Sequence, residues 1–151
     1  MDPRVVRGNP ARTNPGQAAG YSKRPLIEKL GLKSDMRAVF LNAPRNYIKS
    51  LGALPSNVTV MKRLSYPLNF IQVFVTMRKD LEKQIPCLKN SLDKEGMLWI
   101  SWPKSSSGKS TDIKEDTIRD TALPLGLVDV KVCAIDQTWS GLKLVYRRNE
   151  R

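Results

Sequence analysis

The residues of this chain best suited to bind a ligand follow apolar segments in its second half. Trp102 and Lys104 come at the end of one apolar run, and Asp136, Trp139 and Ser140 lie between two others. An aromatic ring, a cation and a carboxylate together suit a planar or anionic ligand. The alternative is that the tryptophans belong to the core and Asp136 only shapes a turn.

Segment 105–111 has the composition of a phosphate-binding loop, Ser-Ser-Ser-Gly-Lys-Ser-Thr, and it contains Ser107 and Lys109. The full pattern requires a glycine five residues before Gly108, and Pro103 occupies that position. A strand before the loop and a helix after it still favour anion binding by backbone N–H groups and the helix dipole. The alternative is a solvated loop.

The residues that are missing exclude several kinds of chemistry. The chain has no histidine, which excludes Ser-His-Asp and Cys-His catalysis and any metal site that needs histidine. Cys87 and Cys133 are far apart and form no C-x-x-C motif, which argues against a zinc or redox site. Asp112, Glu115 and Asp116 have the spacing of a solvated helix face. We therefore expect no catalytic residue, no metal and no cofactor.

The charge of the chain points to anionic partners. It has 26 Lys plus Arg against 14 Asp plus Glu, a net charge of +12 and a pI near 10. Such a field attracts phosphates, nucleic acid, anionic lipid or acidic proteins, although it also serves solubility. We see neither a signal peptide nor an apolar segment long enough to span a bilayer. We expect a cytoplasmic protein with no membrane partner.

The chain divides into a tail and one domain. Residues 1–21 are rich in glycine and proline and poor in apolar side chains, which predicts a flexible basic tail. Residues 22–148 are predicted to form a single folded domain, and 149–151 are its C-terminal end.

The elements that must position the candidate residues alternate between strand and helix. The predicted strands are 37–42, 58–61, 70–75, 97–102, 127–135 and 139–147, and the predicted helices are 25–30, 44–52, 77–92 and 112–123. This order predicts an α/β fold with a mostly parallel sheet of about six strands, helices on both faces and a closing antiparallel hairpin. In such sheets ligands bind outside the carboxyl ends of the strands.

Two local details accompany this prediction. Thr76 is expected to cap the helix that follows it, and Asp112 to cap the next helix with Glu115 at its third position. The link 62–67 is short for a parallel crossover. It therefore predicts either a brief second strand or an irregular strand order.

From residue 68 onward the chain resembles the later half of the Rossmann-like methyltransferase fold. Residues 68–75 (Leu-Asn-Phe-Ile-Gln-Val-Phe-Val) stand where that fold has the strand after its F-D-V-V pattern. Residues 92–100 (Leu-Asp-Lys-Glu-Gly-Met-Leu-Trp-Ile) are similar to its L-x-P-G-G-x-L-x-V entry to the next strand. The resemblance implies a methyltransferase-like fold.

A closer resemblance covers nearly the whole folded part. It is carried by the segments 20–22, 29–31, 41–44, 98–104, 123–134 and 138–143. These segments look like a small bacterial family whose domain has no known function. The resemblance implies the fold but no particular activity.

Both cofactor signatures of a methyltransferase are missing. The turn after the first strand, 42–46, reads Asn-Ala-Pro-Arg-Asn and has no glycine to let the backbone approach a ligand. Met61 ends the second strand, where an acid should follow to hold the ribose hydroxyls, and Lys62 follows it instead. These departures argue against binding of S-adenosylmethionine in the usual mode.

Three hypotheses follow. The favoured one is a non-catalytic binding or interaction domain of degenerate methyltransferase-like fold, which binds an anionic small molecule at the carboxyl edge of the sheet. The second is a nucleic-acid-binding protein that works through charge, using the tail and the basic residues of the terminal hairpin. The third is a divergent S-adenosylmethionine-dependent methyltransferase. The candidate ligand-binding residues are Asn42, Trp102, Lys104, Ser107, Lys109, Asp136, Trp139 and Ser140.

Overall fold

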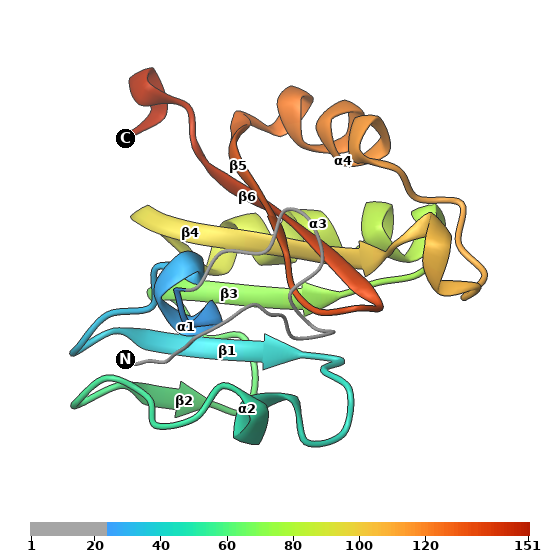
Figure 1. Cartoon of the computed structure of the whole chain (residues 1–151). Helices are drawn as coiled ribbons and strands as arrows, with labels where there is room; N and C mark the ends of the chain where they lie inside the picture. The colour runs from blue at the N-terminus through green and yellow to red at the C-terminus, as the bar shows by residue number, and fades with distance from the viewer. Residues whose placement is uncertain (1–23) are drawn as a thin grey trace.

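A computed structural model describes residues 24–151, which form a six-stranded sheet with helices on both faces (Figure 1). The strands are β1 (Arg37–Leu41), β2 (Thr59–Met61), β3 (Leu68–Phe74), β4 (Leu92–Pro103), β5 (Leu127–Ala134) and β6 (Trp139–Tyr146). Their order in the sheet is β2-β1-β3-β4-β6-β5. The first four strands pair in parallel, and β6 is antiparallel to both β4 and β5. The predicted fold class is confirmed, whereas the predicted tail lies outside the described residues.

The helices lie where the apolar spacing predicted them. They are α1 (Leu26–Leu30), α2 (Tyr47–Ser50), α3 (Arg78–Ser91) and α4 (Glu115–Ala122), with short 3-10 turns η2 (Ser105–Ser107), η3 (Leu123–Leu125) and η4 (Arg148–Glu150). Gly31 ends α1 with a φ of 83°, a left-handed conformation that favours glycine.

The sheet separates two apolar cores, because neighbouring residues of a strand point to opposite faces. On β3, Ile71 and Val73 face the core that contains α3 and α4, whereas Phe70 and Phe74 face the core under α1 and α2. Both faces of this strand are therefore buried. This explains why its sequence is a nearly continuous apolar run rather than an alternating one.

The link from β2 to β3 creates a reversal of strand order. β1 lies between the two strands. β2 is only three residues long, so the predicted alternative of a brief second strand is the correct one. Leu64 of the link packs against the core under α3 and α4. This packing takes the place of a crossover helix. The chain therefore extends to one side of β1 with β2 and to the other side with β3. Ligands of open α/β sheets bind at such switch points.

The loop before α4 is attached to the start of α3, contrary to the capping predictions. Asp112 Oδ1 accepts the backbone N–H of Arg78 at 2.6 Å, so this carboxylate caps α3 and not α4. Thr111 Oγ1 donates to the carbonyl of Thr76, also at 2.6 Å. Spacing along the chain predicts only a local cap, and these contacts form because the loop folds back over a helix more than 30 residues away.

An ion-pair cluster fastens α4 to β5. Arg119 Nε donates to Asp129 Oδ2 at 2.8 Å, and the same guanidinium contacts Glu115 and Asp116. The hydrogen bond from Arg119 lowers the pKa of the Asp129 carboxyl below its usual value. A group with a lowered folded-state pKa stabilises the fold above the unfolded-state pKa, about 4 for Asp. That stabilisation is lost as the pH falls through the folded-state pKa.

Replacing Asp129 with Asn is expected to lower the free energy of unfolding at pH 7 by about 0.5 kcal/mol. The figure is small because the Asp129 side chain is 30% exposed and water screens the pair. The difference from the wild type should shrink at pH 2.5, as measured by urea unfolding at both pH values. Asp116→Asn is the control, because that side chain is 88% exposed and should contribute nothing measurable. Equal losses at the two pH values would rule out the ion pair as the cause.

Candidate functional site

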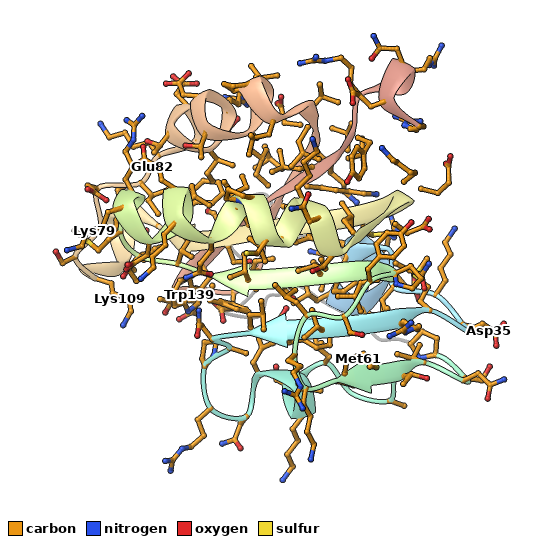
Figure 2. The ribbon with its side chains drawn as sticks, turned by 180° about the vertical axis from the view of Figure 1, so that it is seen from behind. Asp35, Met61, Lys79, Glu82, Lys109 and Trp139 are labelled. Atoms are coloured by element: carbon orange, nitrogen blue, oxygen red, sulfur yellow. The ribbon has the colours of Figure 1, made fainter. Side chains whose placement is uncertain are left out.

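Two cavities lie at the carboxyl ends of the parallel strands. The first, which we call the switch-point cavity, lies where β1 and β3 end and has a volume of about 420 Å³. The second, which we call the lysine cavity, lies beyond the end of β4 and has a volume of about 810 Å³. Figure 2 shows Lys109 and Trp139, which line the switch-point cavity, at the end of the molecule opposite to Asp35.

The switch-point cavity has an apolar floor and a polar rim. Phe74, Val75 and Trp139 form the floor and are 3%, 4% and 7% exposed. The rings of Phe74 and Trp139 pack edge to face with centroids 5.1 Å apart, so the indole ring is mostly in the core. The other lining residues are Asn42, Pro44, Thr76, Asp80, Gln84 and Lys109. A few polar groups around an apolar surface are typical of small-molecule sites.

The turn after β1 reaches this cavity with a left-handed backbone. Asn42 has a φ of 58° and Asn46 a φ of 67°, a region that asparagine tolerates better than most residues. The missing glycine therefore does not prevent left-handed backbone in this turn. It does change the room beside it, because the Asn42 side chain lines the cavity.

The lysine cavity is lined by three lysines, Lys104, Lys109 and Lys114. Within residues 24–151 none of the three forms an ion pair. Glu115 also lines the cavity, but its carboxylate is bound to Arg119. The cavity therefore has an excess of positive charge that the neighbouring side chains do not neutralise. Its other lining residues are Trp102, Pro103, Ser105, Ser106, Gly108, Ser110, Thr111, Ile113 and Ser140.

The phosphate-loop-like segment 105–111 is held by hydrogen bonds between its own residues and Lys104. The Ser107 hydroxyl donates to the carbonyl of Lys104 at 2.7 Å and accepts the backbone N–H of Lys109 at 3.1 Å. The Ser107 N–H donates to the same carbonyl. These two backbone donors are thus occupied within the loop and are not available to an anion. Ser107 itself lines neither cavity.

Asp136 organises the turn between β5 and β6. Its Oδ1 accepts the backbone N–H groups of Thr138 and Trp139, both at 2.8 Å, and it lines neither cavity. The carbonyl of Thr138 in turn accepts the N–H of Lys104 at 2.8 Å. Asp136 therefore positions Trp139 and ties this turn to the end of β4.

Two tryptophan N–H groups at the cavities lack partners. Trp99 Nε1 donates to the carbonyl of Leu30 at 2.8 Å, whereas Trp102 and Trp139 have no hydrogen-bond partner for their indole N–H within residues 24–151. Each of these two side chains is only 7% exposed, and each lines one of the cavities. Buried polar groups nearly always have partners, so an unpaired donor beside a cavity calls for an explanation.

A buried polar chain supports the floor of the site. Tyr47 Oη donates to Gln72 Oε1 at 2.9 Å, and Gln72 Nε2 donates to Ser101 Oγ at 3.0 Å. Burial raises the pKa of the Tyr47 phenol well above its usual value, and the carboxylate of Asp136 raises it further. The phenol is therefore protonated at neutral pH, as its hydrogen bond to Gln72 requires.

The structure brings six of the eight predicted residues to the cavities. Trp102, Lys104 and Ser140 line the lysine cavity, Asn42 and Trp139 line the switch-point cavity, and Lys109 lines both. Ser107 and Asp136 lie behind them and shape the loops. Sequence reasoning missed the lining residues Thr76, Asp80, Gln84 and Lys114.

Some of the missed residues had a signal in the sequence. Thr76 comes directly after a predicted strand, at the edge where ligands bind. Asp80 and Gln84 are four residues apart, which places them on one face of the following helix. Lys114 had no such signal, because its position depends on the path of the loop before α4.

Other kinds of site are not found in the described part of the chain. Residues 24–151 contain no group of three or more metal-ligating side chains. Both cysteines are free thiols. No helix in this part is long and apolar enough to cross a membrane.

The fold is similar to that of S-adenosylmethionine-dependent methyltransferases. One from Aquifex aeolicus is 15% identical with a TM-score of 0.57, over 79% of this chain and 86% of that one. A ribosomal protein L11 methylase from Lactobacillus delbrueckii subsp. bulgaricus is 12% identical with a TM-score of 0.55, over 82% and 75%. Aeropyrum pernix fibrillarin, solved with natively bound S-adenosyl-L-methionine, is 12% identical with a TM-score of 0.53, over 83% and 70%. At these identities the similarity establishes the fold alone.

The comparisons of sequence find a match to one family model and no activity. A search of curated proteins finds no match. Residues 74–148, from the end of β3 to just beyond β6, match the profile of a family described as "Protein of unknown function (DUF3052)". The predicted resemblance to a family of unknown function is confirmed, since residues 74–148 match the DUF3052 model within a chain of Rossmann-like, methyltransferase-like fold.

Proposed function

We propose that this protein is a non-catalytic binding domain that holds an anionic small molecule at the carboxyl edge of its sheet. The observation that carries the proposal is the set of three lysines around the lysine cavity, none of which forms an ion pair within residues 24–151. Like charges gathered at one concave surface repel each other and concentrate a field that attracts anions. A bound anion relieves this repulsion.

The architecture around the lysines supports the same proposal. The lysine cavity shares Lys109 with the cavity at the β1/β3 switch point, where open α/β sheets bind their ligands. The loop that carries the lysines is held by Thr111 and Asp112 on the start of α3, and the facing turn is held by Asp136. The ammonium groups are therefore carried by loops that hydrogen bonds fix in place, which reduces the entropy lost on binding.

A thermal-shift panel followed by calorimetry tests the proposal. The panel contains pyrophosphate, nucleotides, phosphosugars, S-adenosylmethionine and a short RNA. An anionic small molecule is expected to raise the melting temperature, and Lys109→Ala is expected to remove most of that shift. Lys79→Ala is the matched control, because Lys79 is an exposed lysine of α3 that lines neither cavity. The absence of any shift, or equal losses in the two variants, would refute the proposal.

A divergent methyltransferase is the second candidate, favoured by the fold and by the cavity at the switch point. It differs from the first in requiring S-adenosylmethionine to bind. Calorimetry with S-adenosylmethionine, and competition by its demethylated product, separate the two. Heat of binding that Asn42→Asp or Trp139→Ala alters would favour the methyltransferase, and no heat would remove it.

Charge-driven nucleic-acid binding is a third reading, and its support comes from another surface. Lys131, Lys143 and Lys33 approach one another at the β5–β6 hairpin, and burial together with these like charges lowers the pKa of Lys143. Binding of the short RNA that weakens steeply with salt and is lost in Lys131→Glu, but not in Lys109→Ala, would favour this reading.

A further inference from the structure

The two cavities meet at one side chain. Lys109 lines both of them, whereas Trp139 lines only the switch-point cavity and Trp102 only the lysine cavity. The shared residue places the two cavities next to each other along the carboxyl edge, with volumes of about 420 and 810 Å³. Each volume is in the range of small-molecule sites, and a ligand that occupies both has to pass Lys109.

The two cavities differ in chemistry. The lysine cavity offers two ammonium groups that it does not share, Lys104 and Lys114, the indole N–H of Trp102, which has no partner within residues 24–151, and several hydroxyls. Its one carboxylate, Glu115, is paired with Arg119. The switch-point cavity mixes donors and acceptors, with the amides of Asn42 and Gln84 beside a carboxylate. Only the donors of the lysine cavity suit a group that carries negative charge and accepts hydrogen bonds on every side.

Charge also decides which end of the ligand lies in which cavity. Asp80 lies at the switch-point cavity and would repel an anionic group placed there. It suits instead a neutral group with hydroxyls or ring N–H atoms to donate. Amide side chains are complementary to the same kind of group, because each carries a donor and an acceptor.

We infer that the ligand is a nucleoside phosphate whose nucleoside part lies in the switch-point cavity and whose phosphates lie in the lysine cavity. The inference rests on the proposed function and specifies its ligand. The ring lies over the apolar floor formed by Phe74, Val75 and Trp139 and meets the polar rim with its edges. The phosphates take the ammonium groups of Lys104, Lys109 and Lys114, and Lys109 stands at the junction. Trp102 and Trp139, whose indole N–H groups have no partner within residues 24–151, lie one beside each part of this ligand.

Calorimetric titration of the whole chain tests this inference with three probes: the four ribonucleoside diphosphates, the matching nucleosides, and pyrophosphate. One diphosphate is expected to bind at least tenfold more tightly than its nucleoside and than pyrophosphate. Lys104→Ala/Lys114→Ala is expected to reduce the affinity for that diphosphate to the level of the nucleoside. The same variant should leave the affinity for the nucleoside unchanged.

Two conservative variants separate the halves of the site. Trp139→Phe removes an indole N–H but keeps an aromatic floor, and it should weaken nucleoside and diphosphate by the same factor. Trp102→Phe should weaken only the diphosphate and pyrophosphate. Lys79→Ala/Lys83→Ala, which removes two exposed charges of α3 outside both cavities, should change nothing beyond a weak effect of net charge.

The outcomes distinguish this inference from the proposed function. If pyrophosphate binds as tightly as every diphosphate, or if a phosphosugar binds and no nucleotide does, the nucleoside inference is wrong while the anion-binding function stands. If none of the anions binds, both are wrong. If the diphosphate binds but Lys104→Ala/Lys114→Ala leaves its affinity unchanged, the assignment of the phosphates to the lysine cavity is wrong.

Discussion

Replacing Trp99 with alanine is expected to lower the free energy of unfolding by about 4 kcal/mol. Trp99 is fully buried in the core under α1, and its indole N–H donates to the carbonyl of Leu30 at 2.8 Å. The substitution opens a cavity the size of an indole ring. It also leaves a buried carbonyl at the end of α1 without its donor, which adds a desolvation cost.

Chemical denaturation followed by circular dichroism measures this loss. Trp99→Phe retains most of the ring volume and loses the hydrogen bond, so it should lower the free energy of unfolding by about 2 kcal/mol and remain folded. Leu123→Ala is the surface control, because Leu123 is 40% exposed, and it should cost well under about 1 kcal/mol. If Trp99→Phe and Leu123→Ala lower the free energy of unfolding by the same amount, the hydrogen bond from Trp99 to Leu30 does not anchor β4 to α1.

Replacing Gln72 with leucine is expected to lower the free energy of unfolding by about 3 kcal/mol. Gln72 is fully buried between the Tyr47 hydroxyl and Ser101, and it hydrogen-bonds to both. Leucine fills a similar volume and makes neither bond. Two buried polar groups then lose a partner, and each unsatisfied group costs about 1–3 kcal/mol.

A set of combined variants identifies the hydrogen bonds as the cause. In Tyr47→Phe/Gln72→Leu/Ser101→Ala, no member of the chain is left as an unsatisfied polar group, because all three are apolar. This triple variant should therefore be more stable than Gln72→Leu alone, since removing every partner together is nearly neutral. Additive losses across the three positions would show that packing, and not hydrogen bonding, is what Gln72 contributes.

The strands and helices were predictable because their signals are local. A run such as 70–75 is apolar on both faces, and only a strand covered on both sides accommodates that pattern. The first helix begins after Pro25, whose ring presets φ, and ends at Gly31, which adopts a left-handed conformation. The hairpin of β5 and β6 followed from two strand patterns separated by a short turn.

The candidate site was predictable only in outline. The rule that parallel strands end at one edge placed Asn42, Trp102 and Lys104 along the same edge of the sheet, because that rule depends on topology alone; Asn42 lines one cavity there and the other two residues line the second. It did not separate Asp136, whose carboxylate faces its own turn, from Lys109, whose side chain borders both cavities. That distinction depends on side-chain direction, which spacing along the chain does not encode.

The amino-acid sequence by itself determined the α/β class, the lack of histidine chemistry and the basic charge, because composition and local periodicity are sufficient for each. Only the tertiary structure decided that Asp112 caps α3, that Lys109 lines two cavities and that two indole N–H groups have no partner within residues 24–151. Each of these depends on contacts between segments distant in sequence. Such contacts are fixed by how the loops pack over the sheet edge, and no local propensity specifies that packing.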